Sequence, residues 1–291
     1  MKVYIDGNYY EKDEAKISVF DHGLLYGDGI FEGIRVYGGI VFKLREHLER
    51  LYRSAQAIAL EIPMGIGELE AATLEAVRVN SKREGYIRLV VTRGVGDLGV
   101  NPFLCRRASV VIIVGDIALY PKDSYEKGIK LLSSSVRRIG PNNFDVRIKS
   151  LNYLNNVLAK IEASRAGCME AILLNEQGYV AECTADNLFI VSGNLLRTPG
   201  AVDGALEGIT RGTILELAGR TGLPSDCTRL TQYDLYTADE CFITGTGAEI
   251  MPVVEIDGRR IGSGAPGPWT AKLREAFRKM LAQLAVEGRT P

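Results

Sequence analysis

One lysine stands where a charged side chain is seldom placed. Lys149 lies in the stretch VRIKSLNYLNN, directly after Ile148 and two residues before Leu151, so its amine would lie against apolar surface. The ordinary interpretation is a lysine whose stem is buried and whose charge reaches water. The chemical interpretation is an amine that reacts in its neutral form, since only the free amine attacks a carbonyl group. The rest of the chain distinguishes between the two.

Two glycine-containing segments could bind an anion through backbone N–H groups. The segment EGITRG, Glu207–Gly212, leads into a predicted helix, and the free N–H groups of a helix start bind anions without any net positive charge. A simple threonine cap is the plainer interpretation of the same residues. The segment TGTGAEI, Thr244–Ile250, follows a predicted strand, and its small residues let the backbone approach a ligand closely. A surface turn would have the same composition.

Two charged side chains could complete such a site. Glu182 precedes an apolar strand in YVAECTADNLF, and a half-buried carboxylate needs a cationic partner because an unpaired buried charge is costly. Arg50 lies on the polar side of a predicted helix, where a solvated arginine is the default, but its rigid donor fork also suits a phosphate. A lysine, two anion-binding segments and a carboxylate together match pyridoxal phosphate, which has an aldehyde, a phosphate and a pyridine nitrogen that a carboxylate keeps protonated.

A third glycine pattern leads to a different interpretation. GVGDLG, Gly94–Gly99, fits the G-x-G-x-x-G fingerprint, but a dinucleotide site needs this motif to open a helix. Here Gly99 is followed by Val100, Asn101 and Pro102, then by polar residues and another predicted strand. We interpret these glycines as turn residues, and a nicotinamide-dependent oxidoreductase is kept as an alternative.

Composition and charge exclude several classes of protein. The chain has 291 residues, 46% of them hydrophobic, and its 35 Lys and Arg against 36 Asp and Glu give a net charge of -1, so no basic field exists for nucleic acid or an anionic membrane. The polar N-terminus does not resemble a signal peptide, and no apolar run approaches the roughly 20 residues of a membrane span. Five scattered cysteines without Cys-x-x-Cys suit reduced thiols in a cytoplasmic protein, and two histidines make a metal site or a His-dependent nucleophile unexpected.

Hydrophobic patterning predicts strands and helices without strict βαβ alternation, so we expect an α+β protein with two mixed α/β domains. We place a small N-terminal domain at residues 1–117, an interdomain loop at 118–127 and a large C-terminal domain at 128–291. The expected strands are Lys2–Ile5, Tyr9–Tyr10, Phe31–Tyr37, Ile40–Lys43, Tyr86–Arg93, Ser109–Gly115, Ile129–Val136, Ala171–Asn175, Tyr179–Glu182, Leu188–Val191 and Glu240–Thr244. The expected helices are Leu44–Leu60, Ile66–Lys82, Ser150–Ala166, Thr210–Arg220 and Pro268–Val286.

The motifs occur in the order found in a known family. SVFDHGLLYGDGIFEGIRVY, YIRLVVTRG, IKSLNYLNN, GYVAECTADNLF, GITRG and TGTGAEIMPV resemble those of the class IV aminotransferases, which are pyridoxal-phosphate enzymes of fold type IV. The resemblance covers nearly the whole chain. Within the family the chain is most similar to branched-chain amino acid aminotransferases, on FEGIRVY, the Tyr86-x-Arg88 pair and GVGDLGVNP. D-amino acid aminotransferases usually carry Arg-x-His in the loop that here reads Leu98–Asn101.

The resemblance implies a role for each matched residue. Lys149 matches the lysine that forms the Schiff base and moves a proton between the substrate Cα and the cofactor C4′, and Glu182 matches the partner of the pyridine nitrogen. The other cofactor matches are Tyr153 at the phenolic oxygen and Arg50, Ile209, Thr210 and Thr246 at the phosphate. The substrate matches are Thr246, Gly247 and Tyr86 at the α-carboxylate, Phe31 at the side-chain pocket, Arg88 at the distal carboxylate of glutamate, and Tyr26 and Val100 reaching the pocket from a partner subunit.

The implied activity is transfer of the amino group of leucine, isoleucine or valine to 2-oxoglutarate, giving branched-chain 2-oxo acids and L-glutamate, by a homodimer or higher homo-oligomer. One stretch departs from the pattern: many branched-chain enzymes have a Trp-Gly-x-Tyr type of sequence in the interdomain loop, where this chain reads VGDIALYPKD and its single tryptophan is Trp269. The residues that cover the pocket and the breadth of substrates therefore stay open. The alternatives are a D-amino acid or (R)-amine transaminase, an aminodeoxychorismate lyase, and a non-catalytic binding protein on the same scaffold. Lys149, Glu182 and the phosphate residues together argue against a non-catalytic protein.

Overall fold

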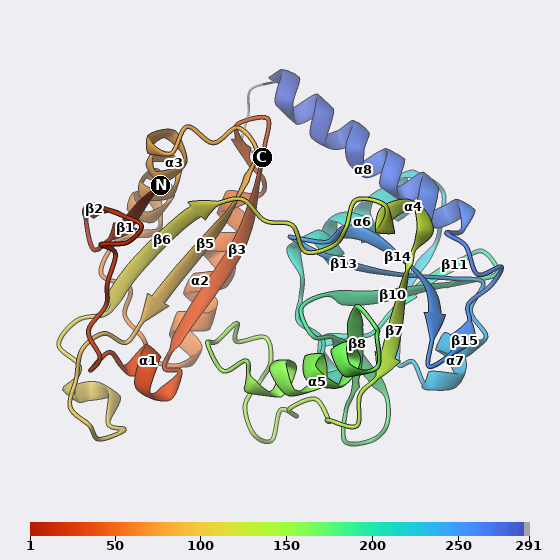
Figure 1. The fold of residues 1–291 in the computed structure, drawn as a ribbon, viewed down its shortest axis with the longest axis horizontal. Helices are drawn as coiled ribbons and strands as arrows, with labels where there is room; N and C mark the ends of the chain where they lie inside the picture. Colours follow the sequence, from red (N-terminus) through yellow and green to blue (C-terminus); the bar gives the residue numbers. More distant parts are fainter. Residues whose placement is uncertain (288–291) are drawn as a thin grey trace. The chain divides into compact units, whose positions relative to one another are not determined.

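The computed structural model describes residues 1–287 and divides them into two compact units, each with its own sheet (Figure 1). The expected α+β class is confirmed. The first segment of unit 1 ends at Ile117, where the expected N-terminal domain ends, whereas residues 118–127 are grouped with unit 2, and residues 148–152 and the described chain from Ala282 are grouped with unit 1. Unit 1 consists of Met1–Ile117, Ile148–Asn152 and the described chain from Ala282, and unit 2 of Ala118–Arg147 and Tyr153–Leu281.

Unit 1 contains a sheet of six described strands in the order β2-β1-β6-β5-β3-β4, each antiparallel to its neighbours. The first hairpin turns at Asp6-Gly7, where both residues have positive φ values, 48° and 95°. This is the primed type of two-residue turn that an Asp-Gly pair predicts. The strands are β1 (Lys2–Ile5), β2 (Asn8–Glu11), β3 (Gly29–Tyr37), β4 (Ile40–Val41), β5 (Gly85–Thr92) and β6 (Ser109–Gly115).

The core of unit 1 lies between this sheet and two helices, α2 (Leu44–Ala57) and α3 (Ile66–Val79) (Figure 1). Alternate residues of β3 and β5, such as Ile34 and Leu89, are fully buried in that core. Since neighbouring strand residues point to opposite faces, the residues between them lie on the other face of the sheet. The remaining helices of unit 1 are α1 (His22–Tyr26) and the 3₁₀ helix η1 (Pro102–Leu104).

Unit 2 contains a mixed sheet of nine described strands in the order β12-β11-β10-β13-β14-β7-β8-β9, with β15 beside β14. Strand β7 is parallel to both of its neighbours, β14 and β8. Strand β13 is antiparallel to both of its neighbours, β10 and β14. The strands are β7 (Ile129–Ser133), β8 (Glu170–Leu174), β9 (Val180–Cys183), β10 (Asn187–Ser192), β11 (Leu195–Thr198), β12 (Ser225–Cys227), β13 (Glu240–Gly245), β14 (Glu249–Ile256) and β15 (Arg259–Arg260). The helices are α4 (Ser124–Lys127), α5 (Leu154–Arg165), η2 (Ala201–Asp203), α6 (Ile209–Arg220), α7 (Gln232–Tyr236) and α8 (Pro268–Glu287).

Two of the differences between the predicted and the observed elements have a local physical reason. The helix expected from Ser150 begins only at Leu154, because the preceding segment pairs with β3 instead: Ser150 bridges Ile30 in an antiparallel register. Strand β14 was not expected at all, since Pro252 lies inside it and proline usually marks an edge or a break in a strand. Pairing with β7 begins only at Val253, so the missing N–H of the proline falls outside that ladder.

Helix α8 is amphipathic, as the sequence predicts, and Glu240 at the start of β13 holds its first turn. The Glu240 carboxylate accepts hydrogen bonds from the N–H groups of Trp269 and Thr270 at 2.9 and 2.8 Å, and Leu273 and Phe277 are buried. A carboxylate at a helix N-terminus satisfies donors that have no partner within the helix. Among residues 1–287, no helix has the length and the apolar content that crossing a membrane requires.

Candidate active site

Lys149 lies in the extended segment of unit 1 that pairs with β3. Its backbone N–H donates to Ser54 Oγ of α2 at 3.2 Å, and its carbonyl accepts from the N–H of Phe31 at 3.0 Å. Its Nζ lies 4.6 Å from the centroid of the Phe31 ring. The amine therefore lies beside an aromatic face at the rim of the core.

The sheet face opposite α2 brings three predicted substrate residues together. The Arg88 guanidinium lies 4.6 Å from the centroid of the Phe31 ring and 5.5 Å from that of Tyr86, and Arg88 donates to the Tyr86 hydroxyl at 3.3 Å. A guanidinium over aromatic faces is stabilised electrostatically and keeps its N–H groups for a further ligand. Unit 1 alone thus places an arginine, two aromatic rings and the Lys149 amine in one cluster.

The helix-covered face of the same sheet carries Arg50, and here the expectation of a solvated arginine is wrong. Arg50 is only 6% exposed, and it donates to both carboxylate oxygens of Glu32, from Nε at 2.8 Å and from NH2 at 2.7 Å. His47 Nδ1 lies 2.7 Å from Glu32 Oε2. Glu32 is wholly buried in β3, next to Phe31 but on the opposite face. One strand therefore supplies the aromatic ring on one face and the carboxylate that orients the arginine on the other.

The electrostatics of this cluster follow from its burial. Burial alone raises the pKa of Glu32, but the Arg50 guanidinium and the His47 imidazole outweigh it and hold the pKa well below its ordinary value. Burial lowers the pKa of His47 below its ordinary value even beside the carboxylate. The cluster is thus a buried Glu32 and Arg50 ion pair with the His47 ring beside it. Neither Glu32 nor His47 was predicted; a carboxylate inside the apolar run GIFEGIRVY was the available signal.

In unit 2, Glu182 of β9 is 6% exposed and has the cationic partner that its sequence context predicts. Arg138 NH2 donates to Glu182 Oε1 at 2.5 Å. The other oxygen accepts from Asn187 Nδ2 at 3.0 Å and from the N–H of Leu206 at 2.9 Å. Three donors from separate segments therefore hold this carboxylate in one orientation, and Arg138 and Asn187 were not predicted.

Arg138 also links Glu182 to the start of α5. Its NH1 donates to Asn156 Oδ1 at 3.1 Å, and Asn156 Nδ2 donates to the carbonyl of Thr184 at 2.6 Å. Tyr153 precedes the first residue of α5, and its carbonyl accepts from the N–H of Val157 at 2.9 Å. The helix start that carries Tyr153 and the strand end that carries Glu182 are thus joined by buried hydrogen bonds.

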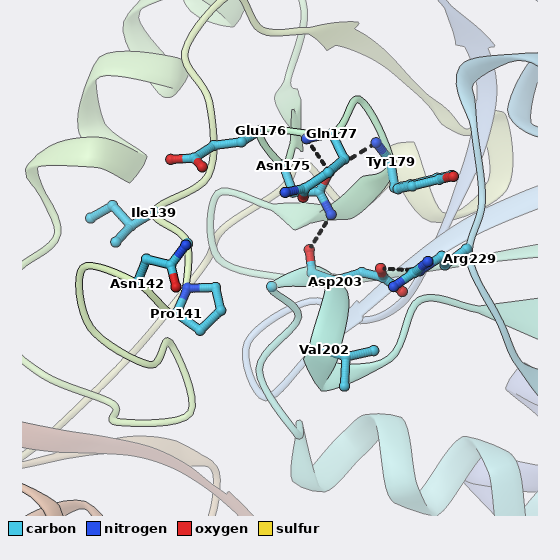
Figure 2. Close-up of a pocket in the computed structure, with 12 residues that line it drawn as sticks. Ile139, Pro141, Asn142, Asn175, Glu176, Gln177, Tyr179, Val202, Asp203 and Arg229 are labelled. Carbon is cyan, nitrogen blue, oxygen red and sulfur yellow. Dashed lines mark hydrogen bonds and ion pairs between the residues drawn. The ribbon is translucent and has the colours of Figure 1, made fainter.

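Unit 2 also contains a cavity of about 290 Å³, and Figure 2 shows its lining side chains. Asp203 forms its floor: the carboxylate accepts from Arg229 Nε at 3.0 Å, and the carbonyl accepts from Asn175 Nδ2 at 3.3 Å. Gly204, which also lines the cavity, accepts at its carbonyl from Arg138 Nε at 3.1 Å. None of the predicted site residues lines this cavity, so it is not part of the predicted cofactor or substrate site.

The anion-binding segment of unit 2 is the start of α6. Gly208 is the N-cap, no side chain caps the helix, and Ile209 and Thr210 form its first turn, with Thr210 buried. The N–H groups of that turn are therefore available to an anion. Nearby, Thr244 of β13 is fully buried, and its hydroxyl has no hydrogen-bond partner in the described part of the chain.

The position of Thr244 relative to α6 follows from the strand register. Thr244 pairs with Asn187 across β13 and β10, so both side chains share one face of the sheet, and Asn187 Nδ2 donates to the carbonyl of Leu206, just before α6. A buried hydroxyl without a partner costs about 1–3 kcal/mol, which a bound oxyanion would offset. Thr246 and Gly247 follow in the turn between β13 and β14. The donors present fit a phosphate group, as the sequence predicts, and add Thr244 to the candidates.

Tyr26 and Val100 face outward in the single chain. Tyr26 is 37% exposed and Val100 is 76% exposed, and the Tyr26 hydroxyl donates to the carbonyl of Leu98 in the loop that carries Val100. The structure thus ties Tyr26 to the loop that carries Val100. Gly94–Gly99 is followed only by the three-residue helix η1, which agrees with turn glycines and argues against a dinucleotide fingerprint.

Comparisons with known proteins identify the family. The model of the class IV aminotransferases matches residues 29–256, and the chain belongs to that family. It is 48% identical to a putative branched-chain-amino-acid aminotransferase of Methanocaldococcus jannaschii, over 99% of both chains. The crystal structure of the Escherichia coli branched-chain amino acid aminotransferase superposes with a TM-score of 0.94 at 36% identity, covering 96% of this chain and 94% of that one. The branched-chain aminotransferase of the archaeon Thermoproteus uzoniensis, solved with norvaline, gives a TM-score of 0.90 at 40% identity, over 97% and 94% of the two chains. The resemblance to the class IV family and its branched-chain members is confirmed.

Proposed function

We propose that this protein transfers the amino group of leucine, isoleucine or valine to 2-oxoglutarate, with pyridoxal 5′-phosphate as its cofactor. The observation that carries the proposal is the cluster of unit 1, where Arg88 lies over Phe31 and Tyr86 beside the Lys149 amine. The side chain of the substrate is aliphatic in leucine, isoleucine and valine, but it ends in a carboxylate in glutamate and 2-oxoglutarate. An aromatic wall with one arginine accepts both without leaving a buried charge unpaired.

Relatives with known ligands support the cofactor and the substrate class. Another branched-chain aminotransferase, 40% identical to this chain, has been crystallised with pyridoxamine 5′-phosphate, with N-(5′-phosphopyridoxyl)-L-glutamate and with 4-methylvaleric acid. Those ligands combine a phosphorylated ring, a glutamate and a branched aliphatic acid. For this chain we assign Lys149 to the aldehyde, Glu182 to the ring nitrogen, Tyr153 to the phenolic oxygen, and Arg50, Ile209, Thr210 and Thr246 to the phosphate.

When bound, the cofactor supplies an aldehyde and a protonated ring that accepts electrons from the substrate Cα. Lys149 then holds and moves the proton at Cα, and the Phe31 ring beside its Nζ shields the amine from water. Glu182, held by its three donors, keeps the ring nitrogen protonated.

The substrate itself contacts a second set of residues. Tyr86, Thr246 and Gly247 orient the α-carboxylate. When glutamate is bound, Arg88 binds its distal carboxylate. When leucine is bound instead, Phe31 packs against the aliphatic side chain.

We further propose a homodimer, or a higher homo-oligomer, in the cytoplasm. Unit 1 exposes several large apolar side chains, among them Leu98 at 71% and Phe103 at 80%, and clustered exposed apolar residues mark association surfaces. Tyr26 and Val100 would reach the substrate pocket of the partner subunit. The five cysteines are free thiols, which suits a reducing compartment. Replacing Leu98 with Asp should shift the sedimentation coefficient toward the monomer and lower activity; an unchanged oligomer would contradict this surface.

The experiment that tests the function is an absorption titration of the purified, cofactor-loaded protein with L-leucine. The yellow colour of the bound cofactor should bleach as the amino group is transferred, and 2-oxoglutarate should restore it. Lys149→Ala is the control and should neither form the yellow species nor transfer the amino group. If the wild-type colour forms but leucine leaves it unchanged while D-alanine or an (R)-amine bleaches it, the branched-chain assignment is wrong.

A further inference from the structure

The expected interdomain loop, residues 118–127, overlaps the stretch that departs from the branched-chain pattern and makes specific contacts through two tyrosines. The Tyr120 hydroxyl donates to Asp186 Oδ2 at 3.0 Å, and the Tyr125 hydroxyl donates to the carbonyl of Ala248 at 3.1 Å. Both rings pack against the hydrophobic core of unit 2. Arg274 of α8 donates to the carbonyl of Tyr125 and lies over its ring. The segment is therefore fixed to unit 2 although its sequence has no helical or strand periodicity.

The two hydroxyl groups support opposite ends of one turn. The Gly245–Ala248 turn joins β13 to β14. At its first residue the Asp186 side chain is in close contact: a Cβ atom at Gly245 would collide with Asp186 Oδ1 and lie 3.3 Å from the carbonyl of Ala185. At its last residue, Ala248 is fully buried under Tyr125. Tyr120 thus supports the turn through Asp186, and Tyr125 supports it directly.

The shape of this turn matters because of what it carries. Thr246 and Gly247 lie at its centre, only partly buried, and the proposed function assigns them to the phosphate and the α-carboxylate. Backbone and hydroxyl donors bind a carboxylate well only when they are already oriented, and a displacement of about 1 Å can cost about a hundredfold in rate. A turn held at both ends keeps its donors in place before the substrate arrives.

We propose that Tyr120 and Tyr125 are positioning residues that hold the Gly245–Ala248 turn in the shape that binds the α-carboxylate of the amino acid. The inference rests on the proposed function for the identity of the ligand. The contacts by which the two tyrosines support the turn do not depend on that function.

The test replaces each tyrosine with phenylalanine, which removes one hydroxyl and keeps the ring. Tyr236→Phe is the matched control, because Tyr236 of α7 packs against the same core and its hydroxyl donates at 2.7 Å to Asp257, in the turn between β14 and β15 and away from the Gly245–Ala248 turn. Loss of one hydrogen bond should raise the KM for L-leucine about fivefold, with a smaller change in kcat. In the cofactor-free protein, amide hydrogen exchange of the peptide that covers Gly245–Ala248 should accelerate by a similar factor.

The outcomes separate the two proposals. A rise in KM with faster exchange in Tyr120→Phe and Tyr125→Phe, but not in Tyr236→Phe, supports the positioning role. Unchanged exchange in both variants, or equal effects in the control, overturns it. If the wild-type protein does not transaminate leucine, the proposed function fails, and the exchange rates still decide whether the tyrosines hold the turn. Should one variant fail to fold, the other gives the same test.

Discussion

Asp186 should destabilise the folded protein when it is ionised, and Asp186→Asn should remove that effect. The carboxyl group is 3% exposed, and burial, together with the nearby Glu170 carboxylate, raises its pKa from 3.8 to about 7, against the opposing hydrogen bond from Tyr120. An acid with a higher pKa in the folded state holds its proton more tightly there than in the unfolded chain. Its ionisation therefore weakens folding, with no effect below about pH 4 and the full effect above about pH 7.

The magnitude follows from the difference between the two pKa values. A shift from 3.8 to about 7 corresponds to about 4 kcal/mol at pH 8, at 1.36 kcal/mol for each unit, and to roughly 2 kcal/mol at pH 5, where the unfolded chain is already ionised. The difference in free energy of unfolding between Asp186→Asn and the wild type should therefore grow by about 2–3 kcal/mol from pH 5 to pH 8. Asparagine keeps an oxygen that accepts the hydrogen bond from Tyr120, so this bond survives the change.

Urea unfolding of the cofactor-free protein, measured from pH 5 to pH 8 with both variants, tests this prediction. Tyr120→Phe is the control: it keeps the carboxyl group and removes the hydrogen bond that opposes the rise in its pKa, so its stability should fall with pH at least as steeply as that of the wild type. Parallel curves for wild type and Asp186→Asn across this range would refute the argument, because they would mean that Asp186 takes up no extra proton on folding.

Three further predictions concern the buried polar clusters. Arg138→Met should lower the free energy of unfolding by about 3–5 kcal/mol, since it leaves the Glu182 carboxylate buried without a cation, and Arg138→Lys should recover part of the loss in the same denaturant assay. Glu32→Gln should raise the dissociation constant for pyridoxal phosphate at least tenfold, about 1.4 kcal/mol, because Arg50 loses the carboxylate that orients it; unaltered affinity in a fluorescence titration would show that Arg50 needs no such support. Thr244→Val should leave the cofactor-free protein as stable as the wild type or about 1 kcal/mol more stable, and should weaken cofactor binding. A clear loss of stability in the cofactor-free protein would instead show that the Thr244 hydroxyl has a hydrogen-bond partner.

The sequence by itself determined which chemistry the chain carries and where its regular elements lie. Lys149 among apolar residues, the Glu207–Gly212 segment before an expected helix and the ordered motifs were visible without coordinates. The Asp6-Gly7 hairpin and the amphipathic helices followed from turn chemistry and periodicity, because those signals arise between residues close in sequence.

Only the tertiary structure decided how the charged groups are paired and oriented. Arg50 meets Glu32 from 18 residues away, and Arg138 meets Glu182 from 44 residues away, so no local pattern records either pair. The residues before α5 read as helix, yet they pair with β3 because the strand offers their backbone a ladder of hydrogen bonds that an early helix start would forgo. Hydrogen bonds and ion pairs between distant segments exist only once the chain is folded. For that reason the sequence identified the reacting groups, whereas the fold determined the partners that hold them in place.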